Sequence, residues 1–277
     1  MKILVLGGKG MAGHVIVKYL KDQRKSDQIL YTSRDSLDQE GFYLDVLNKS
    51  ELETLIDKIV PDLVINAIGV LNEDAEKHEQ KAFQINALLP HQLVKLMNRR
   101  RGKVIHISTD CVFSGTKGSY TESDAPDGES VYARTKAIGE ITQAPHLTIR
   151  TSIIGPELKE DGIGLFLWFM SQTGEITGYQ RVYWNGVTTL ELAKVINQLI
   201  DEQVEGLIHL HSKNTVSKYE LLKLMEEIFE KKDVTIVPSN PFFLDRTILN
   251  TRQDFHYTVP SYRDMLIELK KWMNNNG

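Results

Sequence analysis

A tyrosine stands four residues before a lysine in the segment SVYARTK, which contains Tyr132 and Lys136. On a helix, this spacing places both side chains on one face. A phenol can donate a proton to an oxygen that gains negative charge, and a nearby ammonium lowers the pKa of the phenol. The pair therefore predicts proton donation to a carbonyl during its reduction. The alternative is an ordinary contact between an aromatic ring and a lysine stem.

Hydroxyl side chains end the apolar run that precedes this helix. The segment KVIHIS reads as a strand, and Ser108 and Thr109 stand at its end. Ligands bind at the carboxyl ends of the strands in parallel sheets. A hydroxyl there can hold a carbonyl oxygen and stabilise its growing charge. Thr109, Tyr132 and Lys136 are therefore the predicted catalytic group, with Ser108 as the neighbouring alternative to Thr109.

Glycines punctuate the segment VLGGKGMAG, between an apolar strand and a helix. Gly7 suits a tight exit from the strand, Gly10 lets the backbone approach a pyrophosphate, and Gly13 lets the helix lie against the sheet. Backbone N–H groups at the helix start, around Met11, can then bind an anion. The alternative is a tight turn without a ligand. Its place in the first strand-to-helix turn favours dinucleotide binding.

The end of the second strand should decide which dinucleotide is bound. Ser33 and Arg34 lie about twenty residues after Gly13, where the ribose-reading residue is expected. A basic residue there favours a 2′-phosphate, whereas an acidic residue favours a bare ribose. We expect NADP, read by Arg34 with Ser33. If the strand ends one residue later, Asp35 would contact a bare ribose and NAD would be preferred. Asp45 is expected to contact the adenine amino group.

Strand-length apolar runs alternate with helical segments through the first half of the chain. The predicted strands cover residues 2–6, 28–32, 62–67, 103–108 and 146–150, and the predicted helices cover residues 11–22, 48–59 and 76–99. We expect Asn48 and Glu51 to form a capping box, and the last of these helices to bend or break before Pro90. The alternation predicts an α/β fold with a doubly wound parallel (Rossmann) sheet. We expect a dinucleotide-binding domain over residues 1–150 and a smaller α/β substrate lobe over 151–277, with some segments returning to the large domain.

Composition argues against several classes of partner. The 277 residues carry a net charge of −4 and no basic stripe beyond Arg99–Arg101, so we expect no nucleic-acid partner. No run reaches the roughly 18 apolar residues of a membrane span. The single Cys111 forms no internal disulfide, which fits the reducing cytoplasm. His209 and His211 share a strand face without a third ligand, which predicts a hydrogen-bonded surface pair and no metal site.

Several segments together resemble one known family. They are GGKGMAG, INAIG, AFQINA, ISTDCVFSG, YTESD, VYARTKAIGE and IRTS, with weaker matches in WNGVTTLELA and LDRTILNTR. With these segments, the chain resembles the extended short-chain dehydrogenases/reductases, and most closely their dTDP-4-dehydrorhamnose reductase-like group. The resemblance covers nearly the whole chain. It implies an NADP-dependent reductase of a nucleotide-linked 4-keto-6-deoxy sugar, for deoxysugar or surface polysaccharide biosynthesis.

The resemblance also implies site residues by position. It assigns the catalytic roles to Thr109, Tyr132 and Lys136. The residues that it implies along the cofactor are Asn66, Ala67 and Gly69, with Asn86 in support. The residues that it implies around the sugar are Ser108, Asp110, Cys111 and Val112.

This chain departs from the family at positions that face the substrate there. Cys111 stands where an aromatic residue is common, and Ile153 and Ile154 stand where a tryptophan follows the segment RTS. The resemblance therefore leaves the substrate open between dTDP-4-dehydrorhamnose and, for example, a UDP-linked 4-keto-6-deoxy-hexosamine derivative. Arg246 is expected either to pair with a nucleotide phosphate or to form a salt bridge between the lobes. A homodimer is considered, although the sequence does not determine the oligomeric state.

Two other functions remain open at this point. An epimerase or dehydratase of the same superfamily would return the hydride within one catalytic cycle. Dehydratases add an acid/base pair beside the catalytic hydroxyl, and here Asp110 is followed by Cys111 rather than glutamate. The third alternative is a non-catalytic regulatory subunit with this fold, such as that of methionine adenosyltransferase. The retained tyrosine, lysine and threonine weigh against it.

Overall fold

A seven-stranded sheet forms the centre of the computed structural model, which describes residues 1–159 and 162–276. All neighbouring strands of this sheet pair in parallel. Their order is β11 (Gly206–His209), β6 (Leu147–Thr151), β5 (Lys103–Thr109), β4 (Leu63–Asn66), β1 (Lys2–Leu6), β2 (Gln28–Ser33) and β3 (Phe42–Tyr43). Later strands are added on both sides of β1, which is the doubly wound arrangement that the alternation predicts.

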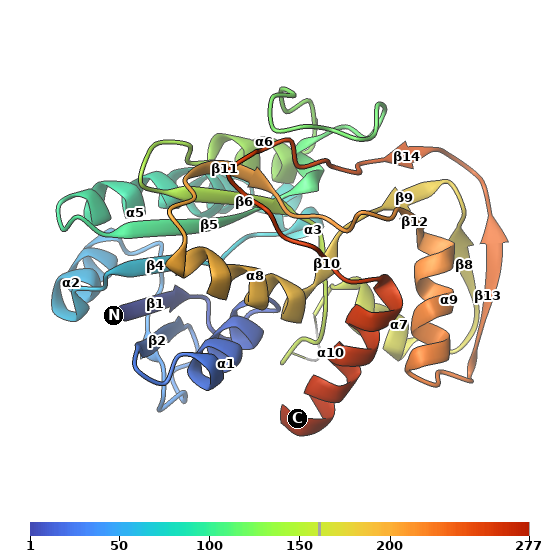
Figure 1. The fold of residues 1–277 in the computed structure, drawn as a ribbon, viewed down its shortest axis with the longest axis horizontal. Coiled ribbons are helices and arrows are strands. Elements are labelled where there is room, and N and C mark those ends of the chain that lie inside the picture. Colours follow the sequence, from blue (N-terminus) through green and yellow to red (C-terminus); the bar gives the residue numbers. More distant parts are fainter. Residues whose placement is uncertain (160–161, 277) are drawn as a thin grey trace.

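Helices cover both faces of the sheet (Figure 1). On one face lie α1 (Gly13–Gln23) and α8 (Thr189–Asp201); on the other lie α2 (Lys49–Ile59), α5 (Leu89–Asn98) and α6 (Val131–Ile138). Side chains alternate between these faces: Ile3 and Val5 pack with α1, whereas Leu4 and Leu6 pack with α2 and α5. The strands are therefore buried on both sides, as continuous apolar runs require.

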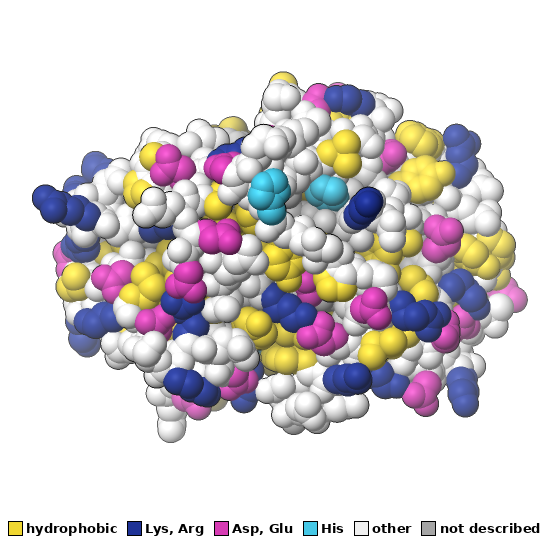
Figure 2. All heavy atoms as spheres, in the orientation of Figure 1, with side chains coloured by type: hydrophobic (Ala, Val, Ile, Leu, Met, Phe, Trp, Pro, Cys, Tyr) yellow, Lys and Arg dark blue, Asp and Glu magenta, His cyan; other side chains and the backbone are white. Residues whose placement is uncertain are grey.

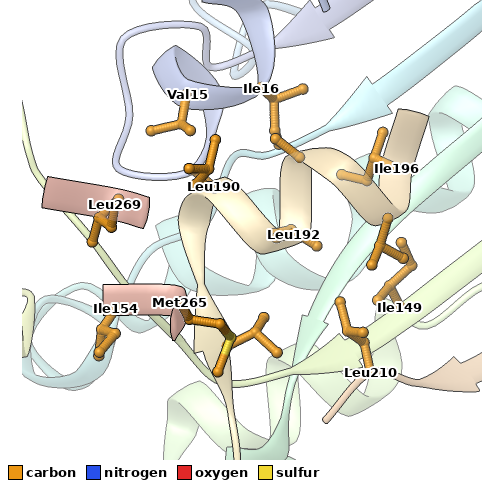
Figure 3. Close-up of a cluster of buried hydrophobic side chains, with 14 of the residues drawn as sticks. Val15, Ile16, Ile149, Ile154, Leu190, Leu192, Ile196, Leu210, Met265 and Leu269 are labelled. Atoms are coloured by element: carbon orange, nitrogen blue, oxygen red, sulfur yellow. The ribbon is translucent and has the colours of Figure 1, made fainter. Parts of the chain in front are cut away.

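The C-terminal half contributes to this sheet. β11 pairs with β6, and Gly206 lies opposite Leu147. α8, which precedes β11, packs beside α1 on the same face of the sheet, where Leu190 and Ile196 lie near Val15 and Ile16 (Figure 3). A strand and its covering helix thus come from beyond residue 150.

The remaining elements lie beyond the carboxyl ends of the strands. They are β7 (Ile153–Ile154), α7 (Leu165–Ser171), β8 (Gly174–Tyr179), β9 (Val182–Trp184), β10 (Val187–Thr188), β12 (Val216–Ser217), α9 (Lys218–Ile228), β13 (Val234–Ser239), β14 (Leu244–Asp245) and α10 (Tyr262–Asn276). β8 pairs with β13, and β9 lies between β12 and β14 (Figure 1). One hydrophobic cluster runs from α1 and α8 into this region, so the two parts share a core.

The expected helix over residues 76–99 is broken into several pieces. These are α3 (Asn72–Lys77), α4 (Glu79–Ala82), a π-helix (Phe83–Leu88) and α5. The chain stays helical through Pro90, so no break occurs there; a π-helix precedes the proline, and the non-helical residue is His78. Such π-helical turns are frequent at functional sites. The expected capping box of α2 is half right. The Asn48 side chain accepts from the Glu51 N–H, but the Glu51 carboxylate accepts from the Asn48 amide instead of its backbone.

The surface carries both signs of charge. On the face in Figure 2, Lys and Arg side chains are interspersed with Asp and Glu. Among the described residues, no helix combines the length and apolarity that crossing a membrane requires.

Candidate active site

Helix α6 begins with a well-defined cap and presents its first turns to the sheet. The Ser130 hydroxyl accepts from the Ala133 N–H at 3.0 Å, and the Glu76 carboxylate accepts from the Val131 N–H at 2.7 Å. These bonds fix the start of the helix that carries Tyr132 and Lys136. Both side chains are buried, with 9% and 4% of their surface exposed.

Lys136 is anchored to β5 behind the tyrosine. Its ammonium donates to the Ile107 carbonyl at 2.6 Å and lies 3.4 Å from Nε2 of His106. Burial lowers the pKa of Lys136 to about 8, and the Glu140 carboxylate opposes that shift. The lysine therefore titrates close to neutral pH.

Burial raises the pKa of Tyr132 above its usual value, and the neighbouring Thr109 hydroxyl opposes the rise. The ammonium of Lys136 is not among the groups that shift it. The expectation of a lowered phenol pKa is therefore wrong for the protein alone, because burial disfavours the phenolate and the ammonium does not offset it. A phenol that stays protonated is the form that a proton donor needs.

Thr109 ends β5 and turns the chain into the short 3₁₀ helix Asp110–Val112. Its hydroxyl donates to the Asp110 carboxylate at 3.2 Å and accepts from the Cys111 N–H at 3.1 Å. Burial raises the pKa of Asp110, against the charges of Lys218 and Arg246. Burial also raises the pKa of the Cys111 thiol to about 12, so this cysteine is not activated as a nucleophile.

Two residues implied to contact the sugar have other partners. The Ser108 hydroxyl donates to the Glu140 carboxylate at 2.8 Å, and Arg150 forms a two-point ion pair with the same carboxylate. Ser108 is thus engaged on the α6 side of β5. Val112 is fully buried in a small cluster with Phe113, which gives it a packing role instead of the implied contact with the sugar.

The glycine turn has the shape that a pyrophosphate requires. Gly7 adopts a φ of +81°, and a Cβ on Gly13 would lie 2.0 Å from the Gly7 carbonyl oxygen. A Cβ on Gly10 would approach only that same oxygen, at 3.3 Å, so the space beside it is open. α1 begins without a side-chain cap and has no acidic residue in its first turn. The His14 N–H already donates to the Gly10 carbonyl at 3.1 Å, so an anion would be bound by the N–H groups before it, next to the half-buried Met11.

The expected ribose-reading residues surround the end of β2. The strand ends at the buried Ser33, and Arg34 is exposed; among the described residues Arg34 has no hydrogen bond or ion pair. Asp35 pairs instead with Lys9 of the glycine turn at 3.0 Å. Sequence reasoning misses Lys9, although it stands between the glycines and its ammonium reaches the end of β2. Asp45 is half-buried after β3, and its carboxylate accepts from a backbone N–H at 3.0 Å.

Two buried asparagines hold the loop that follows β4. Asn66 accepts from the Ile68 N–H at 3.2 Å. Asn86, in the π-helix, bonds both backbone groups of Val70 at 2.8 Å and donates to Thr135 of α6 at 3.1 Å. The implied cofactor residues Ala67 and Gly69 lie between them, and both have exposed surface. The loop is therefore held in place from behind, with its outer side toward the glycine turn: a Cβ on Gly7 would touch the Ile68 side chain.

Two cations from the C-terminal part lie near Cys111. Arg246 donates through Nε to the Phe113 carbonyl at 2.9 Å, and its Nη1 lies 3.8 Å from the Cys111 sulfur. It forms no ion pair within residues 1–159 and 162–276, so the expected salt bridge between lobes is not found. Lys218 begins α9, with its Nζ 5.1 Å from the centre of the Trp184 ring. Sequence reasoning misses Lys218 because its place depends on how α9 folds back.

The two histidines singled out by the sequence do not form a surface pair. His209 is 1% exposed, and its Nδ1 lies 3.0 Å from the Leu249 carbonyl. Burial lowers the pKa of His209 to about 4, against the nearby Glu122 carboxylate. The expectation of a surface position is wrong because β11 enters the sheet. In the part of the chain that the structure describes, no cluster of three His, Cys, Asp or Glu side chains could hold a metal ion.

Comparisons with known proteins agree on the family. A model of the RmlD substrate binding domain matches residues 1–242. The chain is 26% identical over 251 residues to dTDP-4-dehydrorhamnose reductase of Aggregatibacter actinomycetemcomitans, with 86% of this chain and 82% of the relative covered. It is 24% identical over 254 residues to methionine adenosyltransferase 2 subunit beta of Danio rerio, with 86% and 76% covered.

The fold also has counterparts among solved structures. The dTDP-4-dehydrorhamnose reductase of Bacillus anthracis, solved in complex with NADP, superimposes with a TM-score of 0.83. That match covers 98% of this chain and 99% of the other at 19% identity, so it shows the fold alone. The family match over residues 1–242 goes further: the chain belongs to the RmlD substrate binding domain family, within the extended short-chain dehydrogenases/reductases.

Proposed function

We propose that this protein is an NADPH-dependent reductase of a nucleotide-linked 4-keto-6-deoxy sugar. The observation that carries the proposal is that Tyr132 of α6 lies beside the Thr109 hydroxyl at the carboxyl end of β5, while Lys136, one turn later, donates to Ile107 of the same strand. Relatives named dTDP-4-dehydrorhamnose reductase support the substrate class. The similarity to methionine adenosyltransferase 2 subunit beta supports the alternative, a regulatory subunit without catalysis.

The cofactor would lie across the carboxyl ends of β1, β2 and β4. The open space at Gly10 and the uncapped start of α1, around Met11 and Gly13, would hold its pyrophosphate. Ser33 and Arg34, with Lys9 beside them, would bind the 2′-phosphate, and their charge favours NADP over NAD. Asp45 would accept from the adenine amino group. The residues along the nicotinamide half would be Asn66, Ala67 and Gly69.

When bound, NADPH supplies a hydride to the keto carbon. The protein must then place a proton on the carbonyl oxygen and stabilise the charge that develops there. Tyr132 donates that proton, and its raised pKa keeps it protonated beforehand. Lys136 holds the ribose hydroxyls while its bond to Ile107 fixes its stem. Thr109 turns its hydroxyl from Asp110 to the carbonyl oxygen.

The sugar would lie against Asp110 and Cys111, near the ends of Lys218 and Arg246. Arg246 has a free side of its guanidinium for a phosphate oxygen, which favours the phosphate alternative over the lobe-to-lobe salt bridge. The C-terminal elements that carry Lys218 and Arg246 would form the substrate lobe. Whether the nucleotide is dTDP or UDP is decided by the assay below.

A panel of 4-keto-6-deoxy nucleotide sugars, both dTDP- and UDP-linked, tests the proposal. Each is incubated with NADPH or NADH while absorbance of the reduced nicotinamide is followed, and the product is identified by NMR. Stoichiometric oxidation of NADPH with a new alcohol at C4 is the expected result. Tightly retained NAD with sugar isomerisation would instead show an epimerase. No turnover, together with a tight protein partner in a pull-down, would favour the regulatory subunit.

A further inference from the structure

Three polar side chains form a buried line behind the catalytic lysine. Asn66 on β4 and His106 on β5 are direct neighbours in the parallel register of the two strands. The Asn66 amide nitrogen lies 3.1 Å from Nδ1 of His106, and Nε2 of the same ring lies 3.4 Å from the Lys136 ammonium. The line therefore joins the cofactor loop after β4 to the active site through one imidazole.

His106 has no exposed surface. Burial, with the charge of Lys136, holds its pKa well below the usual value, so the ring is neutral. A neutral imidazole carries one proton, and its other nitrogen is an acceptor. The ring and its two neighbours, Asn66 and Lys136, can therefore form matching hydrogen bonds in only two arrangements.

In the first arrangement, the Asn66 amide donates to Nδ1 while its oxygen accepts from the Ile68 N–H. The ring proton is then on Nε2 and points at Lys136, which can accept it only as a neutral amine. In the second arrangement, the Asn66 amide is turned over, and its oxygen accepts from Nδ1–H. Nε2 then accepts from the charged Lys136, and the Ile68 N–H is free for another acceptor.

We propose that His106 is a positioning residue that couples the charge of Lys136 to the orientation of the Asn66 amide, and so to the cofactor loop. This inference rests on the proposed reductase function, in which the charged lysine is the working form. A bound cofactor that accepts a hydrogen bond from the freed Ile68 N–H would favour the second arrangement. Binding of the cofactor thus favours the ammonium form of Lys136.

Few other titratable groups face this line. Glu140, beyond the end of α6, favours the charged form of Lys136, but it is already paired with Arg150 of β6. His91 of α5 acts weakly on His106, and Tyr132 lies one turn from the lysine on α6. His106 is therefore the group best placed to link lysine charge to the loop.

Replacement of His106 tests the coupling through the pH dependence of turnover. His106→Leu removes the acceptor of a buried ammonium, and hydrogen bonds to charged groups are the stronger ones. We expect the alkaline limb of the kcat/KM profile to move to lower pH by roughly one unit. In His106→Gln, the side-chain amide can reach the position of Nε2. We therefore expect the alkaline limb of the kcat/KM profile to return toward its position in the parent protein.

His146→Leu is the matched control. His146 is also fully buried, at the start of β6, and it accepts from the Val104 N–H at 3.1 Å away from the catalytic residues. Both leucine variants should lower the melting temperature, but only His106→Leu should move the limb. If the alkaline limb of the kcat/KM profile does not move in His106→Leu, or moves to higher pH, the proposal is overturned.

A second measurement needs neither a variant nor turnover. In protein labelled with ¹⁵N-histidine, the ring nitrogen shifts of His106 report which nitrogen carries the proton. We expect Nδ1–H below the lysine titration, Nε2–H above it, and a shift toward Nδ1–H when NADPH is added at pH 8. One tautomer throughout pH 6–9.5 overturns the proposal. Because no substrate is used, this result stays separate from failure of the proposed reductase function.

Discussion

The Lys136 ammonium donates a 2.6 Å hydrogen bond to the carbonyl of Ile107, two residues before Thr109. This bond ties the middle of α6 to the end of β5. Tyr132 lies one turn earlier on the same helix, so the bond also sets the position of the phenol relative to Thr109. One contact between a helix and a strand thus helps to align all three residues of the proposed catalytic group.

Replacement of the phenol should separate catalysis from binding. Tyr132→Phe keeps the buried ring but removes the proton donor, so we expect kcat to fall by about 10²- to 10⁴-fold. NADPH affinity, measured by fluorescence titration, should stay unchanged. Tyr43→Phe, at an exposed tyrosine, is the control and should keep full activity. A fully active Tyr132→Phe protein would refute the mechanism.

The cations near the end of β2 should determine cofactor preference. Arg34→Ala removes a charge-assisted bond to the 2′-phosphate, and we expect the KM for NADPH to rise about 10- to 100-fold. The KM for NADH should change little. Lys9→Ala should act in the same direction, whereas Lys25→Ala, on the exposed end of the α1–β2 turn, should have no effect. Equal losses with both cofactors would contradict the assignment.

Two glycines of the same turn should respond differently to a methyl group. In Gly10→Ala the added Cβ meets only the Gly7 carbonyl oxygen at 3.3 Å, so the melting temperature should hold while NADPH affinity falls. In Gly13→Ala the Cβ would lie 2.0 Å from that oxygen. Such overpacking costs about 1–3 kcal/mol, so the melting temperature should drop by several degrees. Calorimetry and cofactor titration measure both effects, and unchanged NADPH affinity in Gly10→Ala would argue against a pyrophosphate there.

The free energy of unfolding should fall at acid pH, partly because of His209. Its folded-state pKa of about 4 lies below the unfolded value near 6.5, so the unfolded chain binds the proton first. The stabilisation from the neutral ring is complete above pH 6.5 and is lost as the pH falls toward 4, by up to roughly 3 kcal/mol. His209→Gln should flatten this part of the pH profile in urea unfolding. The exposed His78→Gln should leave it unchanged, and equal profiles in both variants would refute the assignment.

The local sequence pattern was sufficient to predict much of the fold. The strand Lys2–Leu6 and the cap at Asn48 lie where the sequence predicts them, because runs of apolar side chains and capping residues act over a few neighbours. Strand β3 is not predicted, since two residues carry too little pattern. The long helix also resolves into pieces, since Asn86 must hold the loop after β4.

The candidate site divides in the same way. The spacing of Tyr132 and Lys136 and the glycine turn can be read from the sequence, because each lies within one helix or one turn. The partners of Ser108 and His209 cannot, since they come from the turn after α6, from β6 and from the segment after β14. The direction of the Tyr132 pKa shift also depends on burial, which spacing does not reveal.

The sequence by itself determined the alternating elements, the dinucleotide turn and the reactive residue types, because these depend on neighbours along the chain. Only the tertiary structure decided that β11 and α8 complete the sheet, that Lys9 and Lys218 reach the site, and that His106 joins Asn66 to Lys136. Those relationships arise where strands and helices distant in sequence pack together. Their distances and desolvation are properties of the packing, and no local pattern encodes them.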